Sequence, residues 1–155
     1  MVKTNAIRIL DSAGVRFTAA EYDVSDGRTD GVSVARKIGA EPERVFKTLV
    51  TSGKLTGHNV FIVPAECELD LKKAAVAAGD KYIEMIKAKD LEPLTGYVHG
   101  GCSPFGMKKA LPTYLEETAA LYETIYVSGG RVGLQVELPP DELIRVAGAA
   151  YSDLV

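Results

Sequence analysis

A lysine stands inside an apolar, strand-like run in the first third of the chain. Lys47 lies within residues 45–50 and is flanked by Phe46 and Thr48. Because alternate residues of a strand face opposite sides, Lys47 and Thr48 should point to different faces. A lysine in such a run either extends its ammonium to solvent or directs it into a pocket, where it could hold a phosphate or a carboxylate. The residues alone leave both interpretations open.

Two glycine-rich segments are the next candidates for chemistry. Residues 100–106 contain three glycines and a proline, and Gly129 and Gly130 follow Ser128. Successive amide N–H groups in such a loop can bind a phosphate or the oxyanion of an acyl-transfer transition state. The first segment could equally be a plain connection, and the second a tight hairpin turn.

The cysteines and histidines give little support for nucleophilic or metal chemistry. Cys102 lies in the first glycine-rich segment, but the sequence offers it no partner base and no certain helix N-terminus. Cys67 and Cys102 are far apart, and His58 and His99 have no metal-ligand spacing. No dinucleotide or Walker motif is present. We therefore expect no metal, no cofactor, and two reduced thiols in a cytoplasmic protein.

Composition predicts one globular domain over residues 1–155. Hydrophobic residues make up 46% and charged residues 25%, and the net charge is −3. This charge excludes a strongly basic nucleic-acid binder but allows a local basic patch. The lysine pairs at 72–73 and 108–109 are typical of solvated faces, although either could meet an RNA backbone. Apolar runs such as residues 60–63 fall far short of the roughly 20 residues that span a membrane.

The order of the expected elements is mixed. Helical patterns with capping residues occupy residues 4–13, 33–38, 42–44, 70–78, 88–91 and 139–149. Strand patterns occupy residues 15–22, 45–51, 59–64, 96–99, 124–128 and 133–138. Strands and helices do not alternate strictly, which favours an α+β domain with a largely antiparallel or mixed sheet.

Four ordered motifs carry a family resemblance. They are Phe46-Lys47-Thr48-Leu49, residues 69–73, residues 100–106 and Ser128-Gly129-Gly130. Together they make the chain similar, over essentially its whole length, to the YbaK/EbsC proteins, which are related to the editing domain inserted in bacterial prolyl-tRNA synthetases. The resemblance implies a single α+β domain with a mixed, partly barrel-like β-sheet flanked by helices.

The resemblance also implies an activity. The chain is expected to be a free-standing deacylase that acts on the 3′ end of aminoacyl-tRNA and removes cysteine from Cys-tRNA(Pro), with Cys-tRNA(Cys) as a second substrate. The partners implied are that tRNA and, transiently, prolyl-tRNA synthetase. A deacylase for another mischarged tRNA, such as Ala-tRNA(Pro), and a non-catalytic module that binds a nucleotide or a synthetase stay open as alternatives.

The site residues follow from the same resemblance. Lys47 matches the pocket lysine beside the aminoacyl ester and is the expected catalytic residue. The expected substrate contacts are Tyr22, Thr48, Gly100, Gly101, Cys102, Ser103, Pro104, Gly106, Ser128, Gly129 and Gln135. The chain departs from the family pattern at residues 29–31, where an aromatic is frequent, and at Gln135, where some members carry an acid.

The implied mechanism needs neither an enzyme nucleophile nor a metal. The thiol of the esterified cysteine attacks its own carbonyl and leaves a thiolactone and free tRNA. The protein then contributes orientation, which can lower the barrier by ~7–11 kcal/mol, and electrostatic stabilisation of the oxyanion.

Overall fold

A long antiparallel hairpin is the centre of the fold. The computed structural model describes residues 3–155, and in it β2 (Phe46–Gly53) pairs with β3 (Gly57–Pro64) along its full length. The even-numbered residues of β2 face one hydrophobic cluster, which contains Phe46 and Val50, and Leu49 faces a second. Both faces of the hairpin are therefore covered, which explains why β3 contains a continuous apolar run.

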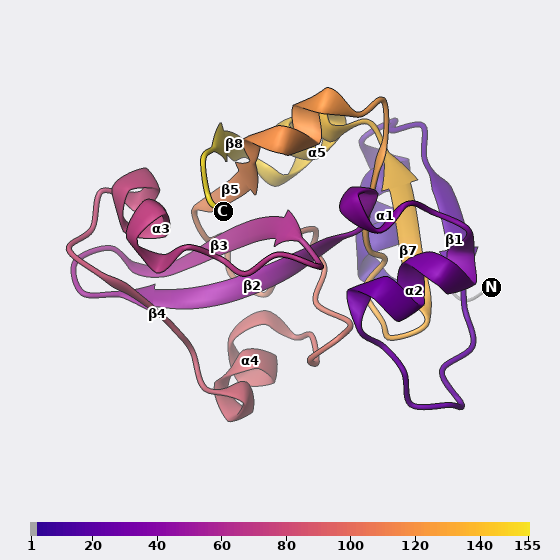
Figure 1. Cartoon of the computed structure of the whole chain (residues 1–155), viewed down its shortest axis with the longest axis horizontal. Helices are drawn as coiled ribbons and strands as arrows, with labels where there is room; N and C mark the ends of the chain where they lie inside the picture. Colours follow the sequence, from indigo (N-terminus) through magenta and orange to yellow (C-terminus); the bar gives the residue numbers. More distant parts are fainter. Residues whose placement is uncertain (1–2) are drawn as a thin grey trace.

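The strands form two β-sheets (Figure 1). The larger has the order β4-β2-β3-β5-β8, where β4 is Ile83–Met85, β5 is Thr113–Glu116 and β8 is Ala149–Ser152. The smaller has the order β1-β7-β6, with β1 at Thr18–Glu21, β7 at Leu134–Leu138 and β6 at Ile125–Ser128. A single parallel bridge from Val45 to Tyr126 links them at the start of β2. The α+β class is confirmed, and the sheets meet without closing into a barrel.

Five helices pack around these sheets. They are α1 (Asn5–Ser12), α2 (Gly31–Ile38), α3 (Leu71–Ala78), α4 (Ala88–Thr95) and α5 (Pro140–Ala147). Their starts follow from side-chain caps: Thr4 Oγ1 accepts from the N–H of Ile7 at 3.1 Å, and Asp70 caps α3 in the same way. Short 3₁₀ turns occupy Pro42–Arg44 and Glu117–Leu121. None of the helices within residues 3–155 is long and apolar enough to span a membrane.

Two helices cover opposite faces of the hairpin. Ala74 of α3 packs with Phe61 and Val63, whereas Leu91 and Leu94 of α4 pack against the cluster that contains Val60. Figure 1 shows α3 and α4 on the two sides of β2 and β3. The cavity described below opens beside α4.

The predicted hairpin and the predicted helices are confirmed, but two predictions differ from the structure. The strand expected at residues 96–99 is wrong, because Gly96 ends α4 at φ +85° and the chain turns there. The helix expected at residues 88–91 continues to Thr95. The strands β4, β5 and β8 were not predicted: β4 has only three residues, and β5 and β8 are paired in parallel with segments that are distant in the sequence.

Asp80 fastens the hairpin turn to the end of α3. Its carboxylate accepts from the hydroxyl and the N–H of Thr56, at 2.6 and 2.8 Å, and from the N–H of Leu55 at 3.1 Å. Desolvation opposes its charge, yet these hydrogen bonds hold the pKa of Asp80 well below its ordinary value. The same carboxylate leaves no room for a side chain at Gly53, whose Cβ would lie 2.1 Å from Asp80 Oδ2.

We expect Asp80→Asn to lower the melting temperature at pH 7. A carboxyl whose pKa is depressed in the folded state stabilises that state above its unfolded pKa and loses this contribution as the pH falls toward the folded value. The difference in melting temperature between the wild type and the variant should therefore narrow below about pH 4, near the unperturbed pKa of an aspartate. Thermal unfolding followed by circular dichroism from pH 7 to pH 3 measures both melting temperatures. A difference in melting temperature that does not change with pH would contradict a stabilising role for the ionised Asp80 carboxylate.

Candidate functional site

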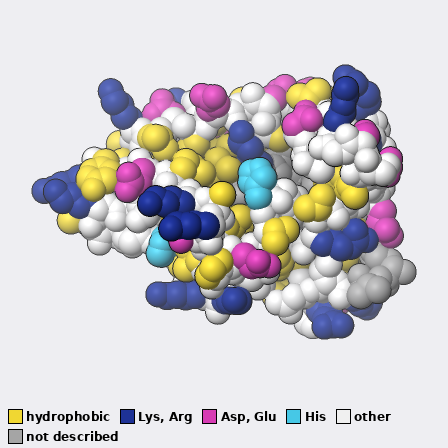
Figure 2. All heavy atoms as spheres, turned by 90° about the horizontal axis from the view of Figure 1, so that it is seen from below, with side chains coloured by type: hydrophobic (Ala, Val, Ile, Leu, Met, Phe, Trp, Pro, Cys, Tyr) yellow, Lys and Arg dark blue, Asp and Glu magenta, His cyan; other side chains and the backbone are white. Residues whose placement is uncertain are grey.

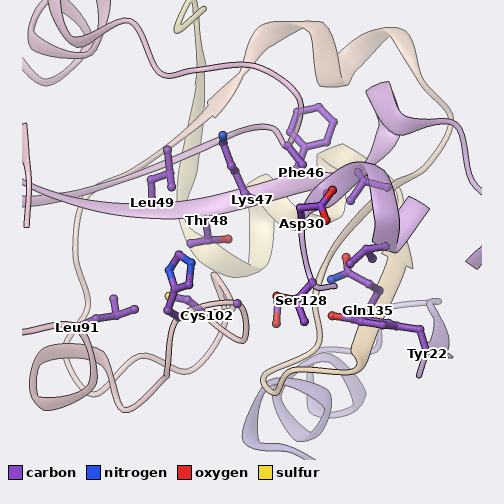
Figure 3. A pocket seen from close by; sticks show the side chains of 17 residues that line it. Tyr22, Asp30, Phe46, Lys47, Thr48, Leu49, Leu91, Cys102, Ser128 and Gln135 are labelled. Atoms are coloured by element: carbon purple, nitrogen blue, oxygen red, sulfur yellow. The ribbon is translucent and has the colours of Figure 1, made fainter. Parts of the chain in front are cut away.

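A cavity of about 290 Å³ opens where the two sheets meet. Its walls come from four places: residues 45–49 of the β2 region, the start of α2, the β6–β7 hairpin, and the segment around Gly100. Figure 3 shows Ser128, Gln135 and Tyr22 on one side of this space and Thr48 and Cys102 on another. Its volume is at the low end for ligand pockets, so it can take one end of a larger molecule.

The structure brings together seven of the expected site residues. These cavity-lining residues are Tyr22, Lys47, Thr48, Gly100, Cys102, Ser128 and Gln135. Five other expected contacts do not line the cavity: Gly101, Ser103, Pro104, Gly106 and Gly129. Their role as substrate contacts therefore stays a prediction, and three of them, Gly101, Ser103 and Gly129, lie next to cavity-lining residues in the sequence. Ser103 is fully buried, and its hydroxyl accepts from the N–H of Phe105.

Glycine is required in these segments for close packing. A Cβ at Gly101 would lie 2.9 Å from the backbone nitrogen of Val132 and 3.1 Å from the backbone of Arg131. The two glycine-rich segments therefore lie directly against each other. A Cβ at Gly129 would lie 2.6 Å from the Leu134 side chain. These glycines fix the cavity wall.

Several lining residues were not predicted as contacts, among them Asp30, Leu91 and His99. Asp30 caps α2 by accepting from the N–H and hydroxyl of Ser33, at 3.1 and 2.7 Å. The next residue, Gly31, lies so close to the hairpin that a Cβ there would be 2.0 Å from that of Ala65. The Asp-Gly pair was a sequence signal for a helix start, but only the fold shows that this start borders a cavity.

The edge of β2 is open at the cavity. The N–H of Ala65 donates to the carbonyl of Val45, so the odd-numbered residues of β2 direct their backbone N–H and C=O groups toward β3. The N–H of Ile86 donates to the carbonyl of Val50, so the even-numbered residues direct theirs away from β3. Strand β4 pairs only with residues 51–53. No strand within residues 3–155 lies beside Thr48, and its N–H and carbonyl face the cavity side.

Two buried acceptors in the cavity have no partner. Thr48 Oγ1 and Gln135 Oε1 are buried and make no hydrogen bond within residues 3–155. Gln135 is only 6% exposed, and leaving such a polar group unsatisfied costs about 1–3 kcal/mol. A ligand that donates hydrogen bonds would remove this cost. Gln135 Oε1 can only accept, so it indicates a ligand that donates a hydrogen bond, and the Thr48 hydroxyl can either accept from or donate to that ligand.

Lys47 occupies the other side of the strand. Figure 3 shows its side chain leaving β2 on the face opposite to Thr48, as strand alternation requires. Its ammonium forms no ion pair and no hydrogen bond within residues 3–155. Lys47 and Thr48 are both lining residues of the cavity, although their side chains leave β2 in opposite directions.

Lys37 of α2 holds the loop that follows Tyr22, and the Tyr22 ring lines the cavity. Lys37 donates to the carbonyls of Asp23 and Arg28, pairs with Asp26 at 2.8 Å, and lies 5.9 Å from the centre of the Tyr22 ring. The N–H of Tyr22 also donates to the carbonyl of Gly133 at 2.9 Å. These contacts fix the ring against the β6–β7 hairpin.

Cys102 is held as a neutral thiol. It is 7% exposed, and burial raises the pKa of the Cys102 thiol to about 12, although a hydrogen bond with Thr95 works in the opposite direction. The thiolate, not the thiol, is the nucleophile. The expectation that Cys102 is a poor nucleophile thus has a physical basis, and its neutral side chain forms part of the cavity wall.

The fold and the cavity define a small α+β domain whose cavity is bordered by a buried, protonated thiol at Cys102. Comparison with known proteins assigns this domain to a family. Residues 28–146 match the model of the aminoacyl-tRNA editing domain. The chain belongs to this family, and the resemblance inferred from the motifs is confirmed.

Individual relatives agree with this membership. The EbsC protein of Enterococcus faecalis, whose name describes a Cys-tRNA(Pro)/Cys-tRNA(Cys) deacylase, is 45% identical over 98% of this chain and 93% of that protein. A crystal structure described as a trans-editing enzyme for prolyl-tRNA synthetase is 28% identical with a TM-score of 0.85, covering 99% of this chain and 98% of that one. A hypothetical protein at 20% identity shares the fold, with a TM-score of 0.88 over 97% of this chain and 99% of its own.

We expect Cys102 to resist alkylation. With a pKa of about 12, only about one thiol in 10⁴ is ionised at pH 8. Iodoacetamide should modify the partly exposed Cys67 much faster than Cys102 in the folded protein, and both at similar rates after denaturation. Mass spectrometry of labelled peptides measures this. Rapid labelling of Cys102 in the folded protein would contradict a buried, protonated thiol.

Proposed function

We propose that this protein is an editing deacylase that removes cysteine from mischarged Cys-tRNA(Pro), with Cys-tRNA(Cys) as a second substrate. The observation that carries the proposal is the pair of buried, unpartnered acceptors in a cavity sized for one end of a ligand. The relation to EbsC supports the choice of an aminoacyl-tRNA as that ligand. The neutral Cys102 supports a mechanism in which the enzyme supplies no nucleophile.

The α-ammonium group of the amino acid is the donor that the cavity lacks. An ammonium carries three N–H donors, and Thr48 Oγ1 and Gln135 Oε1 are the acceptors without partners. Binding the amino group there places the ester beside the open edge of β2. The N–H of Thr48 is then a backbone donor for the ester carbonyl, where negative charge develops in the transition state.

The chemical step is internal to the substrate. The cysteine sulfur attacks the ester carbonyl carbon, a C–S bond forms, and the bond to the ribose oxygen breaks. The thiol proton passes to that oxygen, so the products are a thiolactone and tRNA with a free ribose hydroxyl. Holding thiol and carbonyl in the reactive geometry is the protein's main contribution.

Lys47 acts on the nucleotide side of the ester. Its ammonium has no partner and lies across β2 from Thr48, which suits contact with the ribose oxygen or phosphate of the terminal nucleotide. A positive charge near the leaving ribose oxygen stabilises the charge that develops on it.

A synthetase partner is part of the proposal. A solved relative is described as a trans-editing enzyme for prolyl-tRNA synthetase, and the net charge of −3 gives this chain little general attraction for tRNA. We infer a transient complex in which prolyl-tRNA synthetase presents the mischarged tRNA. Delivery of this kind lowers the affinity for tRNA that the editing protein itself must provide.

We expect rapid deacylation of Cys-tRNA(Pro), little of Ala-tRNA(Pro), and loss of the activity in Lys47→Ala. An alanyl ester has no thiol, and losing a hydrogen bond to a charged group costs about 1.5–3 kcal/mol, or roughly 10- to 150-fold in kcat/KM. Release of labelled amino acid, with and without prolyl-tRNA synthetase, measures these rates.

Lys54→Ala is the control for this experiment, because it removes a lysine from the exposed turn of the same hairpin. Unchanged turnover in Lys47→Ala would remove Lys47 from the site. Cleavage of the alanyl ester would identify a water-dependent reaction, and cleavage of neither ester would indicate a binding module.

We expect Gln135→Leu to lower kcat/KM for Cys-tRNA(Pro) by about 5- to 150-fold, the range for one unsatisfied or lost hydrogen bond of about 1–3 kcal/mol. The same variant should have little further effect on N-acetylcysteinyl-tRNA, which keeps the thiol but lacks the ammonium. Comparing both substrates in both proteins isolates the interaction between Gln135 and the amino group. Equal losses on both substrates would contradict this assignment.

A further inference from the structure

Four exposed lysines beside α4 have no partner. Lys87 and Lys89 lie at its start, and Lys108 and Lys109 follow the glycine-rich segment. None of these ammonium groups forms an ion pair or a hydrogen bond within residues 3–155. We call these four residues the α4 rim.

The α4 rim borders the wall of the cavity. Leu91, in the middle of α4, lines the cavity, and Lys87 is the residue that precedes the helix. At the other end, the aliphatic stem of Lys108 lies over Gly96, where a Cβ would be 3.4 Å from Lys108 Cγ. His99, three residues after Gly96, lines the cavity. The lysines therefore stand at both ends of the helix that forms one side of the opening.

A second hollow continues from this helix. It is an open groove of about 640 Å³ along α4, and its charged lining residues are Lys87 and Lys89 together with Glu84 and Asp90. Ser52, which also lines the groove, and Thr48 are four residues apart on β2, a distance of about 13 Å along a strand. Figure 2, seen from the side that carries α4, shows Lys and Arg side chains and both histidines on this face.

The other lysine pair differs in its contacts. Lys73 pairs with Asp153 at 3.1 Å and also donates to the carbonyl of Val155, so it fastens the last residues to α3. In contrast, neither lysine of the pair at 108–109 forms an ion pair within residues 3–155. Glu84, Asp90 and Glu92 lie in the same region as the rim, so its net charge is low and its contacts must be local.

We propose that the α4 rim binds phosphates of the RNA strand that leaves the cavity. This inference rests on the proposed function and deepens it: the cavity of about 290 Å³ takes the aminoacyl end, and the adjoining nucleotides run over α4 toward the groove. Phosphate contacts position an RNA without reading its sequence. The rim therefore contributes to binding of the tRNA and leaves the chemical step unchanged.

The test compares two double variants of equal charge. Lys89→Ala/Lys108→Ala removes one lysine from each end of α4, and Arg16→Ala/Lys54→Ala removes two exposed cations that line neither hollow. Binding of uncharged tRNA(Pro) is followed by fluorescence anisotropy over a series of salt concentrations. The slope of log Kd against log salt should fall by about 1.4–1.8 in the rim variant, as expected for two phosphate contacts, and stay unchanged in the control.

A kinetic measurement separates binding from chemistry. The rim variant should show a raised KM and an unchanged kcat on Cys-tRNA(Pro), and unchanged kinetics on the cysteinyl ester of adenosine, which is too short to reach the lysines. An unchanged salt slope, or equal changes in the control variant, would overturn the proposal. If the wild type binds tRNA with a rim-dependent slope but cleaves no ester, the proposed function fails and the rim stands.

Discussion

The incomplete pairing of β2 is the constraint on which the site depends. The strand is bonded to β3 along its length, to β4 only at residues 51–53, and to the smaller sheet by one bridge at Val45. Between these contacts its edge is open, and the cavity lies there. An open strand edge offers backbone hydrogen-bonding groups. Lys47 and Thr48 both line this cavity, although their side chains point in opposite directions.

The site favours a reaction in which the substrate supplies the reacting group. Burial keeps Cys102 protonated, so the thiol that lines the cavity is not a nucleophile. Among the polar atoms that line the cavity, Thr48 Oγ1 and Gln135 Oε1 are buried and have no hydrogen-bond partner within residues 3–155. Such groups hold and orient a ligand. Chemistry that requires a substrate thiol also discriminates between amino acids more sharply than a pocket that measures size, where one methylene is worth only ~1–3 kcal/mol.

Close backbone packing gives this cavity its fixed walls. Gly31 brings the start of α2 against Ala65, and Gly101 brings one glycine-rich segment against the other. In both places a Cβ would overlap its neighbour, so a larger residue would push the walls apart. The glycine-rich segments thus act mainly by packing, and the polar contacts come from the residues beside them, such as Ser128.

Local signals determined much of this protein. The caps Thr4 and Asp70, the terminating Gly79 and the alternation around Lys47 are effects of near neighbours, so α1, α3 and the β2–β3 hairpin could be predicted from the sequence. The motifs likewise singled out Lys47, Thr48 and Ser128, and the family resemblance drew attention to Gln135 as a departure from the usual pattern.

The tertiary structure decided what depends on distant partners. Strands β5 and β8 are short and are paired in parallel with segments far away in the sequence, so no local pattern marked them. Only the fold placed Asp30, Leu91 and His99 at the cavity and packed Gly101 against the other glycine-rich segment. The fold also shows that Lys73 forms an ion pair, whereas the lysines of the α4 rim form none within residues 3–155. The physical reason is that burial, packing and ion pairing depend on which segments meet in space, and these meetings are set by the whole chain.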